Sequence, residues 1–108
     1  MSHFVSNKTV QIDLGGGEVV NIRENISFDQ LLPFMKMQAE GKTSEMALTI
    51  PLLVAAIVDW NLLDDDNNPV ELSEDNIKRL RLETIILIGE KVAKKYFPEK
   101  KESGLSKE

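Results

Sequence analysis

The chain has 108 residues, of which 42% are hydrophobic and 29% are charged, and its formal net charge is −5. This length fits one domain with a modest core, and the composition is that of a globular chain and not of a disordered one. The acidic balance disfavours nucleic acid as the main ligand, and the lack of cysteine excludes disulfides and thiolate metal sites.

Neither a signal peptide nor a membrane span is predicted. Residues 1–8 lack the apolar centre of a signal peptide, and the longest apolar run, residues 50–58, is far shorter than the roughly 20 residues that cross a bilayer. We therefore expect a cytoplasmic protein without a membrane partner.

The N-terminal part predicts a β-hairpin over residues 9–23. Polar and apolar residues alternate over residues 9–14, and the three consecutive glycines that follow can supply the positive φ angles of a tight turn before a return strand over residues 18–23. Such a loop can also hold a phosphate, but it lacks the Lys-Ser/Thr pair of a P-loop and precedes a strand, so the turn is favoured. A lone hairpin is marginally stable, and we expect other elements to cover its apolar face, which carries Val10, Ile12 and Leu14.

A first helix is predicted at about 27–40. Ser27 and Gln30 have the spacing of a capping box, and Gly41 is a stop signal. The apolar residues of this helix are expected to face the core, and they are Phe28, Leu31, Leu32, Phe34 and Met35.

A second helix is predicted at about 44–60, capped by Thr43 or Ser44. Pro51 predicts either a kink or a fresh start within it. Residues 52–58 are all apolar, so this helix is expected to be buried in the fold or in an assembly. It ends at Trp60, whose indole is expected to be mostly buried.

An acidic loop follows, and Asp64, Asp66 and Asn68 have the spacing of an EF-hand start. The sixth position of that motif requires glycine but is Pro69, and the twelfth is Asp75 instead of glutamate. A solvated turn rich in Asx residues is therefore favoured over a calcium site.

A third helix is predicted at about 73–97, with Ser73 as its N-cap and Leu72 and Ile77 as a hydrophobic staple. Its main apolar stripe comprises Ile77, Leu80, Ile85, Ile88, Val92 and Tyr96. A neighbouring face carries Leu82, Ile86, Ala93 and Phe97. Such a wide stripe fits either two-sided packing within the domain or contact with a second copy or a partner helix.

The predicted fold is therefore α+β and mostly α. An N-terminal hairpin and a small bundle of about three helices form a single domain over residues 1–97. Residues 98–108 are charged and are predicted to form a disordered tail.

Catalysis is not expected. The only histidine, His3, lies near the N-terminus, so no histidine-based acid, base or metal cluster can be assembled. The carboxylates are concentrated in one loop without an evident apolar pocket that would shift their pKa. A cation-dependent enzyme at residues 64–68 is therefore disfavoured, and no cofactor is expected.

The charge is distributed unevenly. Between residues 40 and 77 the acidic residues face a single base, Lys42, whereas the last predicted helix is basic. An uneven charge distribution usually indicates charged faces that are exposed to solvent. The alternative is that the acidic and basic surfaces dock onto complementary charges of a partner or of a second copy. The basic residues of this helix are Lys78, Arg79, Arg81, Lys91, Lys94 and Lys95.

Residues 58–80 read V-D-W-N-L-L-D-D-D-N-N-P-V-E-L-S-E-D-N-I-K-R-L. An apolar segment ending in Trp-Asn-Leu, an acidic turn and this helix start resemble the tail assembly chaperones of long-tailed phages and prophages. The resemblance covers roughly residues 10–92. It implies a non-enzymatic protein that protects the tape measure protein while tail tube subunits polymerise around it. This chain resembles the short form of that family, or the part shared with its frameshifted longer form.

The expected partners are the tape measure protein, the tail tube protein and further copies of the chain. A structural adaptor or a tail or connector subunit of a phage particle is the alternative, and it differs from a chaperone in being present in mature particles. The residues expected to contact a partner are Trp60, Lys78, Arg79, Arg81, Ile85, Ile88 and Val92.

Overall fold

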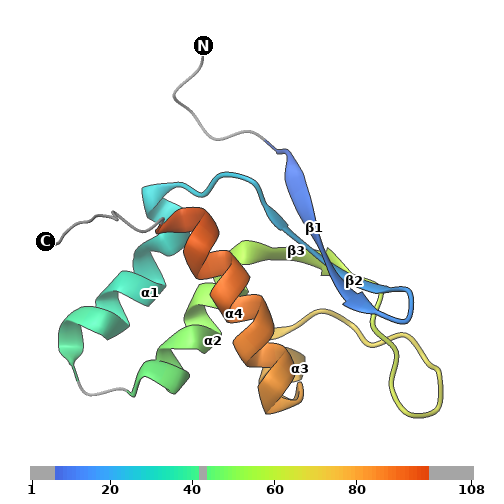
Figure 1. Ribbon diagram of the computed structural model, residues 1–108. Coiled ribbons are helices and arrows are strands. Elements are labelled where there is room, and N and C mark those ends of the chain that lie inside the picture. The colour runs from blue at the N-terminus through green and yellow to red at the C-terminus, as the bar shows by residue number, and fades with distance from the viewer. Residues whose placement is uncertain (1–6, 42–43, 98–108) are drawn as a thin grey trace, which may run out of the picture.

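The computed structural model describes residues 7–41 and 44–97. The strands lie together at one side of the molecule and the helices at the other (Figure 1). The predicted α+β fold, with a hairpin followed by helices, is confirmed, whereas the predicted tail lies outside the described residues. The elements in chain order are β1 (Thr9–Gly15), β2 (Glu18–Arg23), α1 (Phe28–Glu40), α2 (Glu45–Ala56), β3 (Ile57–Trp60), α3 (Glu74–Lys78) and α4 (Leu82–Tyr96).

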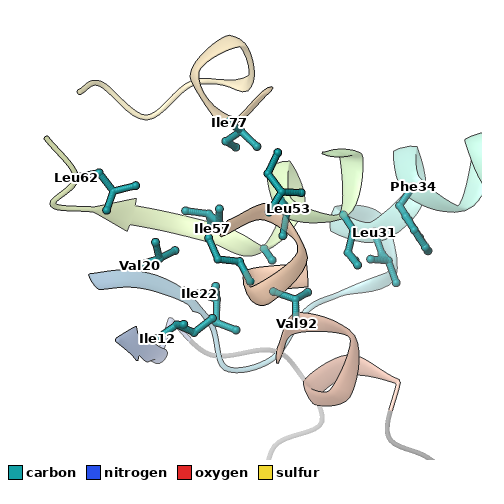
Figure 2. Packing of buried hydrophobic residues seen from close by; sticks show 14 residues of the cluster. Ile12, Val20, Ile22, Leu31, Phe34, Leu53, Ile57, Leu62, Ile77 and Val92 are labelled. Carbon is teal, nitrogen blue, oxygen red and sulfur yellow. The ribbon is translucent and has the colours of Figure 1, made fainter. Parts of the chain in front are cut away.

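The three strands form one antiparallel sheet in the order β1-β2-β3. Gly16 and Gly17 occupy the turn between β1 and β2, and their φ angles of 61° and 83° suit glycine best. As predicted, the apolar face of β1 is covered: Ile12 is buried in the core. Figure 2 shows Ile12 and Ile22 of the sheet opposite Val92 of α4.

The start and end of α1 are as predicted. The Ser27 hydroxyl accepts from the Gln30 backbone N–H at 3.2 Å, and the Gln30 side chain accepts from the Ser27 N–H at 2.9 Å. Gly41 ends the helix in the left-handed conformation. Phe28 was expected to face the core, but it is 69% exposed. It is the first residue of α1, before the turn that contributes the buried Leu31 and Phe34.

The predicted helix over residues 44–60 is shorter than expected. α2 begins after the Ser44 cap, continues through Pro51 and ends at Ala56, so Pro51 does not mark a fresh start. Residues 57–60 form β3, which pairs with β2. β-Branched and aromatic residues suit a strand, and the hydrogen bonds offered by the edge of β2 override the local helical preference.

The expected complete burial of residues 52–58 is also wrong in part. Leu52, Leu53 and Ala56 are buried, but Val54 and Val58 are 42% and 38% exposed. Val54 lies on the outward side of α2, and Val58 is the extra residue at the irregularity in the pairing of β2 with β3. An apolar surface therefore remains outside the core.

The predicted helix over residues 73–97 is two helices. Ser73 caps α3 as predicted, by accepting from the Asn76 N–H at 3.1 Å. The chain leaves the helical conformation at Arg81, whose φ and ψ of −58° and 144° allow α4 to start in a new direction. Ile77 of α3 and Val92 of α4 can then both enter the core, on different sides of the α2 residue Leu53 in Figure 2.

Candidate partner-binding surface

Trp60 closes the base of the acidic loop. Its indole N–H donates to the Val70 carbonyl at 2.7 Å, and its ring is partly buried against the core, in agreement with the expectation of a mostly buried side chain. The Val70 N–H in turn donates to the Leu62 carbonyl at 3.0 Å. Trp60 therefore has a structural role in this fold, which makes it a weaker candidate for partner contact.

Asn61 ties the same loop to the hairpin. Its side-chain oxygen accepts from the Val19 N–H at 2.7 Å, and its side-chain nitrogen donates to the Gly17 carbonyl at 3.0 Å. The backbone N–H of Asn61 also donates to the Val19 carbonyl. Asn61 thus joins segments 42 to 44 residues apart in sequence, whereas the Trp60 hydrogen bond joins residues 10 apart.

The acidic loop uses its first carboxylate for its own turn. One oxygen of Asp64 accepts from the backbone N–H groups of Asp66 and Asn68, at 2.9 and 3.0 Å. Asn67 adopts a left-handed φ of 64°, which Asn tolerates better than most residues. The predicted Asx-rich turn is confirmed. Within residues 7–41 and 44–97, no group of three or more acidic or histidine side chains is arranged to hold a metal ion.

The three apolar residues predicted to bind a partner lie in the core. Ile85, Ile88 and Val92 are buried and face inward from α4. In this fold they cannot reach a partner, because the inward rotation of α4 brings them under the sheet and α2. This part of the predicted contact surface is wrong.

The three basic residues do lie on the surface, around the junction of α3 and α4, and we call them the basic corner. Lys78 is 3.5 Å from Glu74, and Arg81 is 3.5 Å from Glu83, in pairs whose side chains are largely exposed. Exposed pairs of this kind contribute little stability and exchange partners readily. Within the described part of the chain, Arg79 has no ion pair. The basic corner comprises Lys78, Arg79 and Arg81.

Three of the exposed apolar residues in α4 and its C-cap lie on one side of the helix, next to the buried stripe, where the sequence predicted a neighbouring apolar face; the exposed Leu87 points away from this side. Leu82, Ile86 and Phe97 are 61%, 41% and 46% exposed. The ring of Phe97 stacks on Phe34 of α1, with centroids 6.0 Å apart, so this side of α4 extends to the end of α1. We call this surface the α4 flank, and it comprises Leu82, Ile86, Ala93 and Phe97.

Tyr96 and Arg23 fix the C-terminal end of α4 to the sheet. The Tyr96 hydroxyl donates to the Arg23 carbonyl at 2.7 Å, and the Arg23 side chain donates to the Ala55 carbonyl at 2.9 Å. Burial raises the pKa of the Tyr96 hydroxyl above its ordinary value, and the Arg23 charge partly opposes this. These contacts hold α4 in the rotation that exposes the α4 flank.

The fold and the surface together define a small α+β domain with an exposed apolar helix side and an adjacent basic corner. None of its helices, over the residues described, is long and apolar enough to cross a membrane. Comparison with protein-family models, with curated proteins and with solved structures finds no match to this chain.

Proposed function

We propose that the chain is a tail assembly chaperone of a long-tailed phage or prophage, and that it binds helical segments of the tape measure protein. The observation that carries this proposal is the α4 flank, a line of apolar side chains left in solvent by a domain that already has a complete core. The resemblance of residues 58–80 to that family supplies the identity of the partner.

The α4 flank has the dimensions of a site for a helix. From Leu82 to Phe97 it extends for about 22 Å along α4, at the helical rise of about 1.5 Å per residue. Leu82 and Ile86 are four residues apart, as are Ala93 and Phe97, and this spacing matches the apolar face of an amphipathic helix. Covering these side chains supplies affinity without requiring a particular partner sequence.

The basic corner lies at the Leu82 end of the α4 flank. A bound helix with acidic residues at that end would gain attraction from Arg79 and Arg81. Charge therefore strengthens the contact at this end, and apolar contact holds the partner. The proposal includes no catalytic step, and the chain acts by covering aggregation-prone apolar surface.

Co-expression of the chain with its tape measure protein tests the proposal. We expect wild-type chain to keep the tape measure protein soluble and to be recovered with it in a pull-down. Arg79→Glu with Arg81→Glu should weaken recovery at least several-fold, with unchanged circular dichroism of the chain. The matched control, Lys91→Glu with Lys95→Glu, makes the same charge change on the side of α4 away from the flank and should bind normally. A tape measure protein that stays insoluble and unbound with wild-type chain would contradict the proposal.

A structural adaptor or tail subunit is the second candidate, favoured by the exposed Val54 and Val58 on the α2 and β3 side. A permanent subunit would bury this second apolar surface in the particle. Mass spectrometry of purified mature particles separates the two functions, because a chaperone is absent from them and a structural subunit is present in stoichiometric amounts.

A further inference from the structure

The outer edge of β1 is unpaired in the part of the chain that the structure describes. β1 is the first strand in the order β1-β2-β3, and Figure 1 shows no other labelled strand along its outer side. Protein sheets usually protect such edges with proline, with inward-pointing charges or with bulges. Residues 9–13 contain no proline, and their pairing with β2 is regular up to Asp13.

The hydrogen bonds to β2 determine which backbone groups face outward. The Glu24 N–H donates to the Lys8 carbonyl at 2.9 Å, so Lys8 directs its carbonyl toward β2. In an antiparallel pair the direction alternates along the strand. The N–H and C=O groups of Thr9, Gln11 and Asp13 therefore point away from the sheet, and their side chains are exposed.

These outward groups are self-complementary. In an antiparallel pairing of two β1 strands about a two-fold axis at Gln11, each Gln11 lies opposite the other. Thr9 then lies opposite Asp13 of the second copy, where its hydroxyl can donate to a carboxylate. Val10 lies opposite Ile12 of the second copy, which joins the apolar faces of the two sheets. No two like charges are opposed in this register.

We infer that two copies of the chain associate through β1 and join their three-stranded sheets into one continuous sheet. The pairing satisfies the outward backbone groups of Thr9, Gln11 and Asp13 in both copies. It uses a surface separate from the α4 flank, so each copy in a dimer keeps its own α4 flank. This inference does not depend on the proposed function.

Cysteine cross-linking tests the register, since the natural chain has no cysteine. Gln11→Cys places two thiols opposite each other at a Cα separation of about 5.5 Å, which a disulfide can span. Thr9→Cys, on the same face of the same strand, places its thiol about 13 Å along the strand from its copy. Under mild oxidation Gln11→Cys should become mostly covalent dimer while Thr9→Cys stays mostly uncross-linked.

Light scattering on the wild-type chain completes the test, and it should give twice the monomer mass at high concentration. A monomer at every accessible concentration would overturn the inference. So would equal cross-linking of the two variants, or a wild-type dimer in which Gln11→Cys does not cross-link, because the copies would then associate through another surface.

Discussion

At the scale of single residues, the stretch from Trp60 to Val70 shows how side-chain hydrogen bonds replace regular pairing. Trp60 and Asn61 each bind a backbone group far from their own position, and Asp64 binds two within its own turn. The turn and the burial of Trp60 were predictable from the sequence. The hydrogen-bond partners were not, because a hydrogen bond to Val70 or Val19 depends on where the chain returns.

Trp60→Ala should lower the free energy of unfolding by about 3 kcal/mol, near the low end for a large core side chain, because the ring is partly exposed. Urea denaturation followed by circular dichroism measures this. Leu63→Ala, in the same loop at a more exposed position, is the control and should cost clearly less. Near-normal stability of Trp60→Ala would show that the ring does not stabilise the loop. Trp60 would then again be a candidate for partner contact.

Tyr96 should make the free energy of unfolding depend on pH in the alkaline range. Its pKa is raised in the folded state, mainly by burial, so the folded protein binds the proton more tightly than the unfolded chain does. The stabilising contribution is complete below the ordinary value of 10.0 and is lost as the pH rises through the folded pKa. Thermal unfolding from pH 8 upward should show a fall beginning near pH 10 that is smaller in Tyr96→Phe. An equal fall in both proteins would assign it to other groups.

At the scale of elements, the sequence predicts features that depend on neighbouring residues and misses features that depend on long-range contacts. The caps at Ser27 and Ser73 and the stop at Gly41 involve residues within a few positions, and all three were predicted correctly. β3 and the break at Arg81 were missed, because β3 depends on pairing with β2 and the break allows α3 and α4 each to pack against α2. The same limit explains the error in the predicted contact surface, since a wide apolar stripe does not reveal which half faces the core.

The crossing of α2 and α4 fixes that rotation, and Gly89 permits it. A Cβ at Gly89 would lie 2.9 Å from the Thr49 methyl carbon. Gly89→Ala should therefore destabilise the fold by about 1–3 kcal/mol, although alanine is the better helix former. Thr49→Ser removes the methyl group and keeps the hydroxyl, so the double variant should recover most of the loss in urea denaturation. A double variant no more stable than Gly89→Ala alone would show that this contact does not set the crossing.

At the scale of the whole molecule, the exposed α4 flank adjoins the core, through the contact of Phe97 with Phe34, but lies outside it. The sheet, α2 and the inward side of α4 form a continuous buried cluster, so the α4 flank is not needed to complete it. Substitutions in the flank should therefore affect binding more than folding. The domain is small, and burial of this surface by a partner would add stability that its own core cannot supply.

The most direct measurement compares two neighbouring residues of α4. They lie on different sides of the helix, but the exposed fractions of their side chains are nearly equal. Ile86 belongs to the α4 flank and is 41% exposed, whereas Leu87 points away from it and is 38% exposed. Ile86→Asp and Leu87→Asp are each co-expressed with the tape measure protein, and the soluble complex is quantified after purification. We expect Ile86→Asp to reduce the amount of soluble complex at least ten-fold, which corresponds to about 1.4 kcal/mol of binding free energy. Leu87→Asp should leave the amount of complex unchanged. Equal recovery with the two variants, each folded by circular dichroism, would show that the α4 flank does not bind the partner.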